Sequence, residues 1–167
     1  MSKKIICTLI VLLFSVQLFS QTTKVTNCGI FSFFYPSSFT PSNVKKEPGF
    51  VMALESDKCF ISASTMDLYV EGFSIWDDEL IGGFKNAQTP DVKILKTEKI
   101  LVNTKSGKRK SFRMQSNAQS KGKEGFVVQY SFIHKEYLIN VQFVSYENNH
   151  VDCLKYAETL IKGIKFN

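Results

Sequence analysis

The chain has 167 residues, of which 44% are hydrophobic and 13% aromatic, which is enough for one compact domain with its own core and excludes a disordered chain. Its formal net charge of +6 is well below the charge density of a dedicated nucleic-acid-binding protein. Nine glycines and four prolines exclude a collagen-like or linker-like sequence.

The N-terminus has the pattern of a secretory signal peptide. Two lysines precede an almost wholly apolar run over 5–19, and Ser20 offers a small residue at the start of a polar stretch. The apolar run is shorter than the roughly 20 residues that cross a bilayer, which favours a cleaved signal over a membrane anchor. We therefore expect 1–20 to be removed after Ser20 and 21–167 to form a single secreted or periplasmic domain without a membrane span.

The first half of the remaining sequence predicts three strands and a helix. Strand-forming residues occupy 29–35, 50–55 and 59–66, and prolines interrupt the loop 37–49 between the first two strands. The period then changes, and Ser74 with an aspartate three positions later resembles a helix-capping box. Apolar residues spaced four, four and three apart mark one face of this helix: Trp76, Leu80, Phe84 and Ala87.

The second half predicts two antiparallel hairpins and a closing helix. Each hairpin consists of two runs rich in strand-forming residues that are joined by a short turn. An apolar period of 3.6 over 151–164 then predicts a helix with Gly163 as its C-cap, and Ile164–Phe166 can add a short strand. The hairpin arms are 92–103 with 110–118, and 126–133 with 137–143.

Strands that occur in runs, rather than alternating with helices, indicate an antiparallel sheet in an α+β domain. We expect a twisted sheet of about six to seven strands, sandwiched by helices. The hairpin 126–143 alternates cleanly and is expected to form the core of the sheet, with Phe132 and Phe143 fully buried. Because both faces of this hairpin carry apolar residues, a covering layer is expected on each side.

This order of elements resembles the PsbP-like α/β/α sandwich family, which includes PsbP- and DcrB-type domains. The resemblance covers about 28–166 and implies that fold. Family members act as binding or assembly factors and share no common catalytic residues, so the resemblance also implies a non-enzymatic protein. It is carried by an aromatic opening strand, a strand before the first helix, a hairpin and a closing segment: Phe31–Phe39, Ile61–Ser64, Tyr130–Tyr146 and Gly163–Phe166.

We accordingly expect an exported domain that binds or helps to assemble another macromolecule in the cell envelope. The partner would be a protein or another acidic envelope macromolecule, and not a nucleic acid. Two alternatives remain open from the sequence: an immunity or inhibitor protein for a cognate toxin and, less favoured, a small hydrolase. No catalytic residue, cofactor or metal-ligand set is predicted, because the cysteines and histidines lack the spacing of a metal site.

A basic cluster is the surface feature that points to a partner. Seven Lys or Arg residues, with no acidic residue among them, fall between positions 105 and 123. Two interpretations are open: the lysines do no more than prevent the hairpin from aggregating edge to edge, or they attract an acidic partner. The cluster comprises Lys105, Lys108, Arg109, Lys110, Arg113, Lys121 and Lys123.

Three cysteines remain after the predicted signal peptide, and export permits a disulfide between two of them. Cys153 shares a helical face with Ala157 and Ile164 and is expected to pack in the core as a small hydrophobic residue. By elimination the predicted pair is Cys28 with Cys59, each at the beginning of a strand. A strand lying between them would separate their Cα atoms beyond the ~7 Å limit for bridging.

Overall fold

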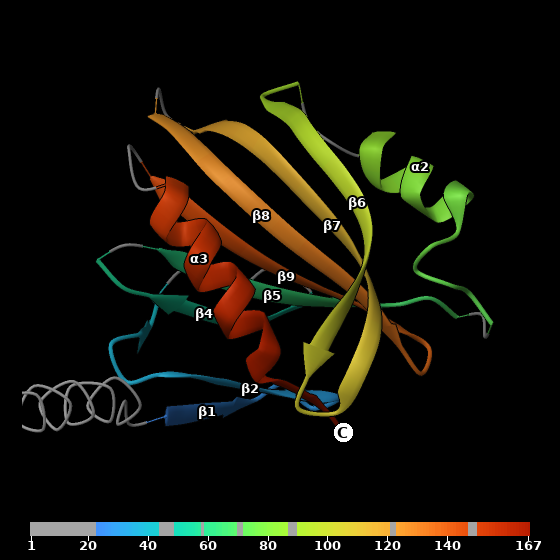
Figure 1. The fold of residues 1–167 in the computed structure, drawn as a ribbon, viewed down its shortest axis with the longest axis horizontal. Helices are drawn as coiled ribbons and strands as arrows, with labels where there is room; N and C mark the ends of the chain where they lie inside the picture. Colours follow the sequence, from blue (N-terminus) through green and yellow to red (C-terminus); the bar gives the residue numbers. More distant parts are fainter. Residues whose placement is uncertain are drawn as a thin grey trace, which may run out of the picture.

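The elements form two sheets and two helices within the described residues (Figure 1). The structure is a computed structural model, and it describes residues 23–43, 49–57, 59–69, 72–86, 90–120, 123–146 and 150–167. The predicted signal peptide, 1–20, lies outside these residues. In the described ranges no helix is both long enough and apolar enough to cross a membrane.

The larger sheet has seven strands in the order β3-β4-β5-β9-β8-β7-β6, and the smaller has three in the order β1-β2-β10. Every pairing is antiparallel, which confirms the predicted α+β class. The small second sheet was not predicted. The elements are β1 (Thr23–Asn27), β2 (Phe31–Pro36), β3 (Thr40–Pro41), β4 (Phe50–Glu55), β5 (Phe60–Asp67), α2 (Asp78–Asn86), β6 (Val92–Thr104), β7 (Gly107–Ser120), β8 (Lys123–His134), β9 (Tyr137–Tyr146), α3 (His150–Leu160), a 3₁₀ turn (Ile161–Gly163) and β10 (Ile164–Phe166).

One face of the seven-stranded sheet is covered by α3 and by the three-stranded sheet (Figure 1). Alternate residues of β8 and β9 point to this face and are buried, because successive side chains of a strand point to opposite sides. The predicted burial of Phe132 and Phe143 is confirmed, since neither side chain is exposed to solvent. This layer holds the main hydrophobic core, and its burial is the largest favourable contribution to folding.

Helix α2 packs against the opposite face through Ile81 and Phe84. The rings of Phe84 and Phe112 stack with their centroids 6.0 Å apart. The ammonium of Lys99 on β6 lies 2.7 Å from the carboxylate of Asp78 and fastens the beginning of the helix. α2 therefore covers the part of this face that is formed by β7 and its neighbours.

The helix begins two residues after Trp76, later than the sequence pattern predicts. Trp76 lies in the turn before α2, where the Asp77 amide donates to the Ser74 carbonyl oxygen at 2.9 Å. The Ser74 hydroxyl oxygen accepts from the Trp76 amide at 3.3 Å. Ser74 thus stabilises a turn that precedes the helix, and the pattern that resembled a capping box belongs to that turn.

The centre of the α2-side face carries a network of amide and hydroxyl side chains on β8 and β9. Gln129 donates to Ser131 at 3.0 Å and to Asn140 at 3.3 Å, and Gln142 donates to Gln129 at 2.9 Å. Gln129 and Ser131 are buried although they are polar. A covering layer was expected on each side of the sheet. On this face the apolar residues are covered by α2, whereas the polar side chains at its centre are satisfied by hydrogen bonds to one another.

The three-stranded sheet joins the beginning of the described chain to its end. β2 lies between β1 and β10, and Phe31 pairs with Phe166. Gly163, at the end of the 3₁₀ turn, lies so close to β2 that a Cβ atom there would overlap the carbonyl oxygen of Phe34. This glycine is required by close backbone approach.

Candidate functional site

Four cations of the predicted basic cluster lie at the turn of the β6–β7 hairpin or directly beside it. Thr104 pairs with Gly107, whose φ of +88° suits a residue without a Cβ atom. Lys105 lies in the turn itself, and the other three follow at the beginning of β7. We call these four residues the basic patch: Lys105, Lys108, Arg109 and Lys110.

The basic patch wraps around the tip of the hairpin. Lys108 and Lys110 lie on one face of β7, and Arg109, between them in sequence, lies on the opposite face. The Lys105 ammonium lies 4.5 Å from the ring centroid of Phe34, and the Arg109 guanidinium lies 5.3 Å from that of Phe166. Both rings belong to the three-stranded sheet. Lys105 and Arg109 therefore lie toward that sheet, whereas Lys108 and Lys110 share the face of α2.

A surface cavity of about 390 Å³ adjoins the basic patch on the α2 side. The Lys110 ammonium lies 4.9 Å from the ring centroid of Trp76, and the Trp76 indole N–H donates to the Ser111 carbonyl oxygen at 3.0 Å. The indole hydrogen bond holds the segment before α2 against β7. The cavity combines apolar and cationic groups, and its lining residues are Phe73, Ser74, Ile75, Lys108, Arg109, Lys110 and Ile133.

The charges of the basic patch are not neutralised by carboxylates within the described part of the chain. The four ion pairs between described residues involve other side chains. The Nε atom of Arg109 is buried and has no hydrogen-bond partner among these residues. Cation–π contacts orient an ammonium or guanidinium without cancelling its charge. The patch can therefore attract and bind carboxylates or other anions.

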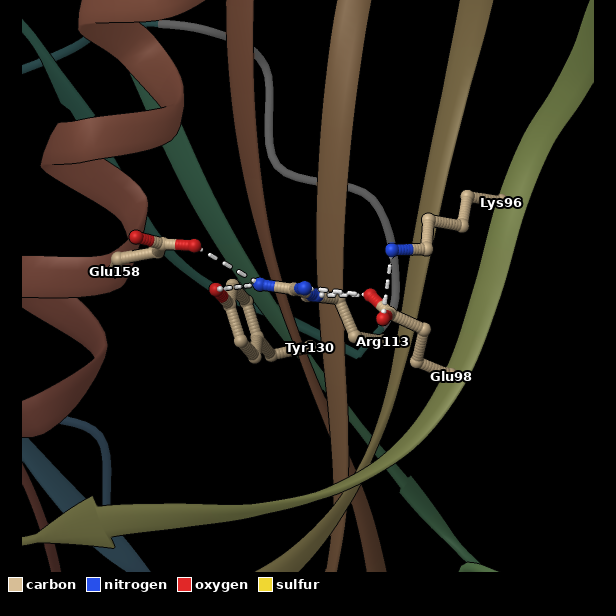
Figure 2. A network of polar contacts seen from close by, with 5 residues as sticks. All are labelled: Lys96, Glu98, Arg113, Tyr130 and Glu158. Atoms are coloured by element: carbon tan, nitrogen blue, oxygen red, sulfur yellow. Dashed lines mark hydrogen bonds and ion pairs between the residues drawn. The ribbon is translucent and has the colours of Figure 1, made fainter.

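Arg113, the fifth member of the predicted cluster, lies apart from the basic patch. Its side chain is only 15% exposed, and its guanidinium lies between the carboxylates of Glu98 on β6 and Glu158 on α3 (Figure 2). Nε donates to Glu98 at 3.0 Å, and Nη1 donates to Glu158 at 3.1 Å and to the Tyr130 hydroxyl at 3.5 Å. Arg113 thus connects α3 to the sheet, and the two carboxylates neutralise its charge, so it does not contribute to a surface for an acidic partner.

This network shifts the pKa values of several of its members, including Glu98 and Tyr130. Hydrogen bonds from Lys96 and then from Arg113 hold the pKa of Glu98 below its usual range. Burial raises the pKa of the Tyr130 hydroxyl, against the opposing effect of Arg113. Because the pKa of Glu98 is depressed in the folded state, its contribution to stability is present above the unfolded-state pKa and is lost as the pH falls through the folded-state pKa.

We expect Glu98→Gln to lower the free energy of unfolding by about 0.5–1 kcal/mol at neutral pH, because exposed and half-exposed ion pairs contribute in that range. Urea unfolding at neutral pH and near pH 3 would measure the difference, which should shrink at the acidic pH as the carboxylate of the unmodified chain takes up its proton. Glu136→Gln, in the exposed β8–β9 turn, is the matched control. A difference that persists unchanged at low pH would show that the charge of Glu98 is not its source.

Two cations of the predicted cluster cannot be placed with the others. Lys121 lies outside the described residues, and only the backbone of Lys123, at the beginning of β8, is described. No group of three or more His, Cys, Asp or Glu side chains that could hold a metal ion occurs in the described ranges.

The structure gives Cys59 a different neighbour from the predicted one. The Cys59 sulfur lies 2.7 Å from the sulfur of Cys153 on α3. The predicted burial of Cys153 is confirmed, since it has no exposed surface. Cys28 precedes β2 in the other sheet, where its amide donates to the Phe31 carbonyl oxygen at 2.8 Å. In this structure α3 brings Cys153 to Cys59, and the Cys28–Cys59 pairing stays a prediction from the sequence.

Sequence reasoning missed the segment Phe73–Ile75, which completes the cavity beside the basic patch. The available signal was the turn-forming Ser74 directly before the helix. That signal locates a turn, but it does not show which strand the turn lies against.

Comparison with known proteins rests on the fold. The sequence matches no protein-family profile and no curated protein. Cyanobacterial PsbP (CyanoP) from Synechocystis superposes with a TM-score of 0.61 at 11% identity, covering 89% of this chain and 93% of that one. The Ran-binding protein Mog1p of Saccharomyces cerevisiae gives 0.56 at 6% identity, with 88% and 96% covered. These likenesses show that the chain has the PsbP-like fold.

Two further bacterial structures share this fold. LpqN, which is involved in cell envelope biogenesis of Mycobacterium tuberculosis, gives a TM-score of 0.55 at 10% identity and covers 92% of this chain and 95% of its own. A protein of Bacteroides thetaiotaomicron gives 0.56 at 12% identity. The match covers 89% of this chain and 49% of the Bacteroides chain, so this chain spans about half the length of that protein.

Proposed function

We propose that this chain is an exported, non-enzymatic binding domain of the cell envelope that recognises an acidic protein through the basic patch. The observation that carries the proposal is the group of cations without carboxylate partners among the described residues, placed beside a cavity of about 390 Å³. Lys108 and Lys110 form the centre of the proposed surface, because both lie on the α2 side and line that cavity.

The physical argument is electrostatic complementarity. A local group of cations without carboxylates beside it raises the rate at which an acidic surface is captured, and salt weakens that attraction. The cavity adds apolar contact area from Phe73 and Ile133, against which a partner's side chain can pack. Arg113 is left out of the surface because Glu98 and Glu158 neutralise it.

Two proteins of the same fold support a binding or assembly role. Mog1p is a Ran-binding protein, and LpqN is involved in cell envelope biogenesis. The N-terminal pattern of a signal peptide, with the predicted cut after Ser20, supports the envelope as the place of action. Under this proposal 21–167 would form the exported binding domain.

We expect the double variant Lys108→Glu with Lys110→Glu to bind poly-L-glutamate, a defined acidic polypeptide, about tenfold more weakly than the unmodified chain at low salt. The same variant should lose whatever acidic protein the unmodified chain captures from envelope extract. Titration by light scattering or calorimetry at two salt concentrations gives the affinities. Arg109 is left intact because it is half-buried against Phe166, and its replacement would mix folding with binding.

The matched control is Lys93→Glu with Lys155→Glu, two exposed lysines on β6 and α3 that change the net charge by the same amount. This control should bind nearly as well as the unmodified chain. Equal binding by both double variants would show that net charge alone attracts the polypeptide. Retention of anionic polysaccharide or lipid vesicles, without retention of any acidic protein, would contradict the proposed partner class.

A further inference from the structure

Two thiols meet in the hydrophobic core between the seven-stranded sheet and α3. The sulfur atoms of Cys59 and Cys153 are 2.7 Å apart, although the residues are separated by 94 positions in the sequence. Cys59 is 4% exposed and Cys153 is 0% exposed. Their sulfur atoms are separated by only about 0.7 Å more than a disulfide bond of about 2.05 Å.

Both cysteines are held in place by the elements that carry them. Cys59 closes a turn with Ser56: the Ser56 amide donates to the Cys59 carbonyl oxygen at 3.0 Å, and the Cys59 amide donates to the Ser56 hydroxyl at 3.2 Å. Cys153 lies one helical turn before the buried Ala157, on the side of α3 that packs against the sheet. A small side-chain rotation would therefore be enough to join the two sulfurs.

We propose that Cys59 and Cys153 form a disulfide that fastens α3 to the beginning of β5. The two thiols lose two protons and two electrons, and a disulfide reagent such as oxidised glutathione accepts the electrons and becomes two thiols. One cysteine attacks the reagent and releases its first thiol, and the other cysteine then attacks the mixed disulfide and releases the second. This inference does not depend on the proposed function.

The reagent would reach the pair from the side of Cys59. Cys59 lines a surface cavity of about 480 Å³, together with Glu55, Asp57 and neighbouring residues. The hydrogen bond with Cys153, followed by burial, holds the pKa of the Cys59 thiol well above its usual range. Because the thiolate is the reactive form, the folded pair would oxidise slowly and resist alkylation.

The topology disfavours the alternative bridge between Cys28 and Cys59. Cys28 lies just before β2, at the end where Phe31 pairs with Phe166 and the Asn167 amide donates to the Ile30 carbonyl oxygen. This end follows the C-terminus of α3, whereas Cys153 lies near the helix N-terminus. α3 rises by about 1.5 Å per residue between Cys153 and its C-terminus. Cys59 lies beside Cys153, so it lies toward the opposite end of the layer from Cys28.

The test is disulfide mapping of the chain after refolding in a buffer of reduced and oxidised glutathione. The chain is unfolded in denaturant at acidic pH to stop exchange, remaining thiols are then blocked by alkylation, the chain is digested without reduction, and linked peptides are identified by mass spectrometry. The expected result is a peptide pair joined through Cys59 and Cys153. A link from Cys59 to Cys28 or to Cys7, or alkylation of both Cys59 and Cys153, would overturn the proposal.

Thermal unfolding of two matched variants gives a second readout. Reduction should lower the melting temperature of the unmodified chain and of the Cys28→Ala variant by on the order of 10 °C each. The reason is that a disulfide that closes a long loop strongly constrains the unfolded state. Reduction should leave the melting temperature of Cys153→Ala unchanged, and an equal fall in that variant would contradict the bridge. Mapping on the unmodified chain decides the question if Cys153→Ala does not fold.

Discussion

Replacement of Phe132 or Phe143 by alanine is expected to lower the free energy of unfolding by about 3–5 kcal/mol in each case. Neither side chain has exposed surface. The ring centroid of Phe132 lies 5.4 Å from that of Phe166 on β10, and that of Phe143 lies 6.0 Å from that of Tyr130. Truncation therefore removes contacts between elements and leaves a cavity that the surrounding core cannot fill.

Urea unfolding, followed by circular dichroism and by the fluorescence of the single tryptophan, measures these losses. Leu101→Ala is the control, because Leu101 is 61% exposed on the outer strand β6. Its expected cost is less than about 0.5 kcal/mol. Losses below about 1 kcal/mol for both phenylalanine variants would mean that the β8–β9 hairpin is not the core that the structure describes.

Gly163→Ala is expected to destabilise the protein by about 1–3 kcal/mol, the usual cost of forcing extra atoms into a packed region. The added Cβ would overlap the carbonyl oxygen of Phe34, which belongs to the backbone of β2 and cannot rotate away. The 3₁₀ turn, or β2 itself, would have to move. Because Ile164 pairs with Phe33 directly beside this contact, the pairing of β2 with β10 would be disturbed.

Gly83→Ala in α2 is the matched control for this substitution. No atom lies within 4 Å of a Cβ built at Gly83, so alanine meets no obstacle there. Alanine favours a helix over glycine, and we expect a gain of about 0.5–1 kcal/mol. Thermal unfolding of the two variants should thus give shifts of opposite sign. A neutral Gly163→Ala would show that the approach of the turn to β2 is not tight in solution.

The sequence pattern predicted those parts of the fold in which neighbouring residues carry the signal. The β8–β9 hairpin was predicted because its alternation is regular and its turn is short. β1 was missed, since its residues are largely exposed and it is recognisable only by its pairing with β2. The pairing of β2 with β10 likewise joins distant segments, and neither segment shows it locally.

The candidate site was also predicted only in part, because grouping residues by their proximity in sequence ignores which face of a strand each one occupies. Proximity in sequence grouped Arg113 with Lys108 and Lys110, but an odd spacing along a strand places residues on opposite faces. That alternation was present in the sequence and would have separated Arg113 from the two lysines. The meeting of Cys59 with Cys153 had no such signal, because it depends on how α3 packs on the sheet.

The central place of β2 in the small sheet has a consequence for the order of folding. β2 is synthesised early, yet one of its two edges is paired only by Ile164–Phe166. An interval of 135 residues separates Ser32 from its hydrogen-bond partner Asn167. Contacts between such distant segments form late and slow the folding of a chain. During synthesis this edge would stay open until the final strand emerges, so the three-stranded sheet can be completed only after the other described strands have been made.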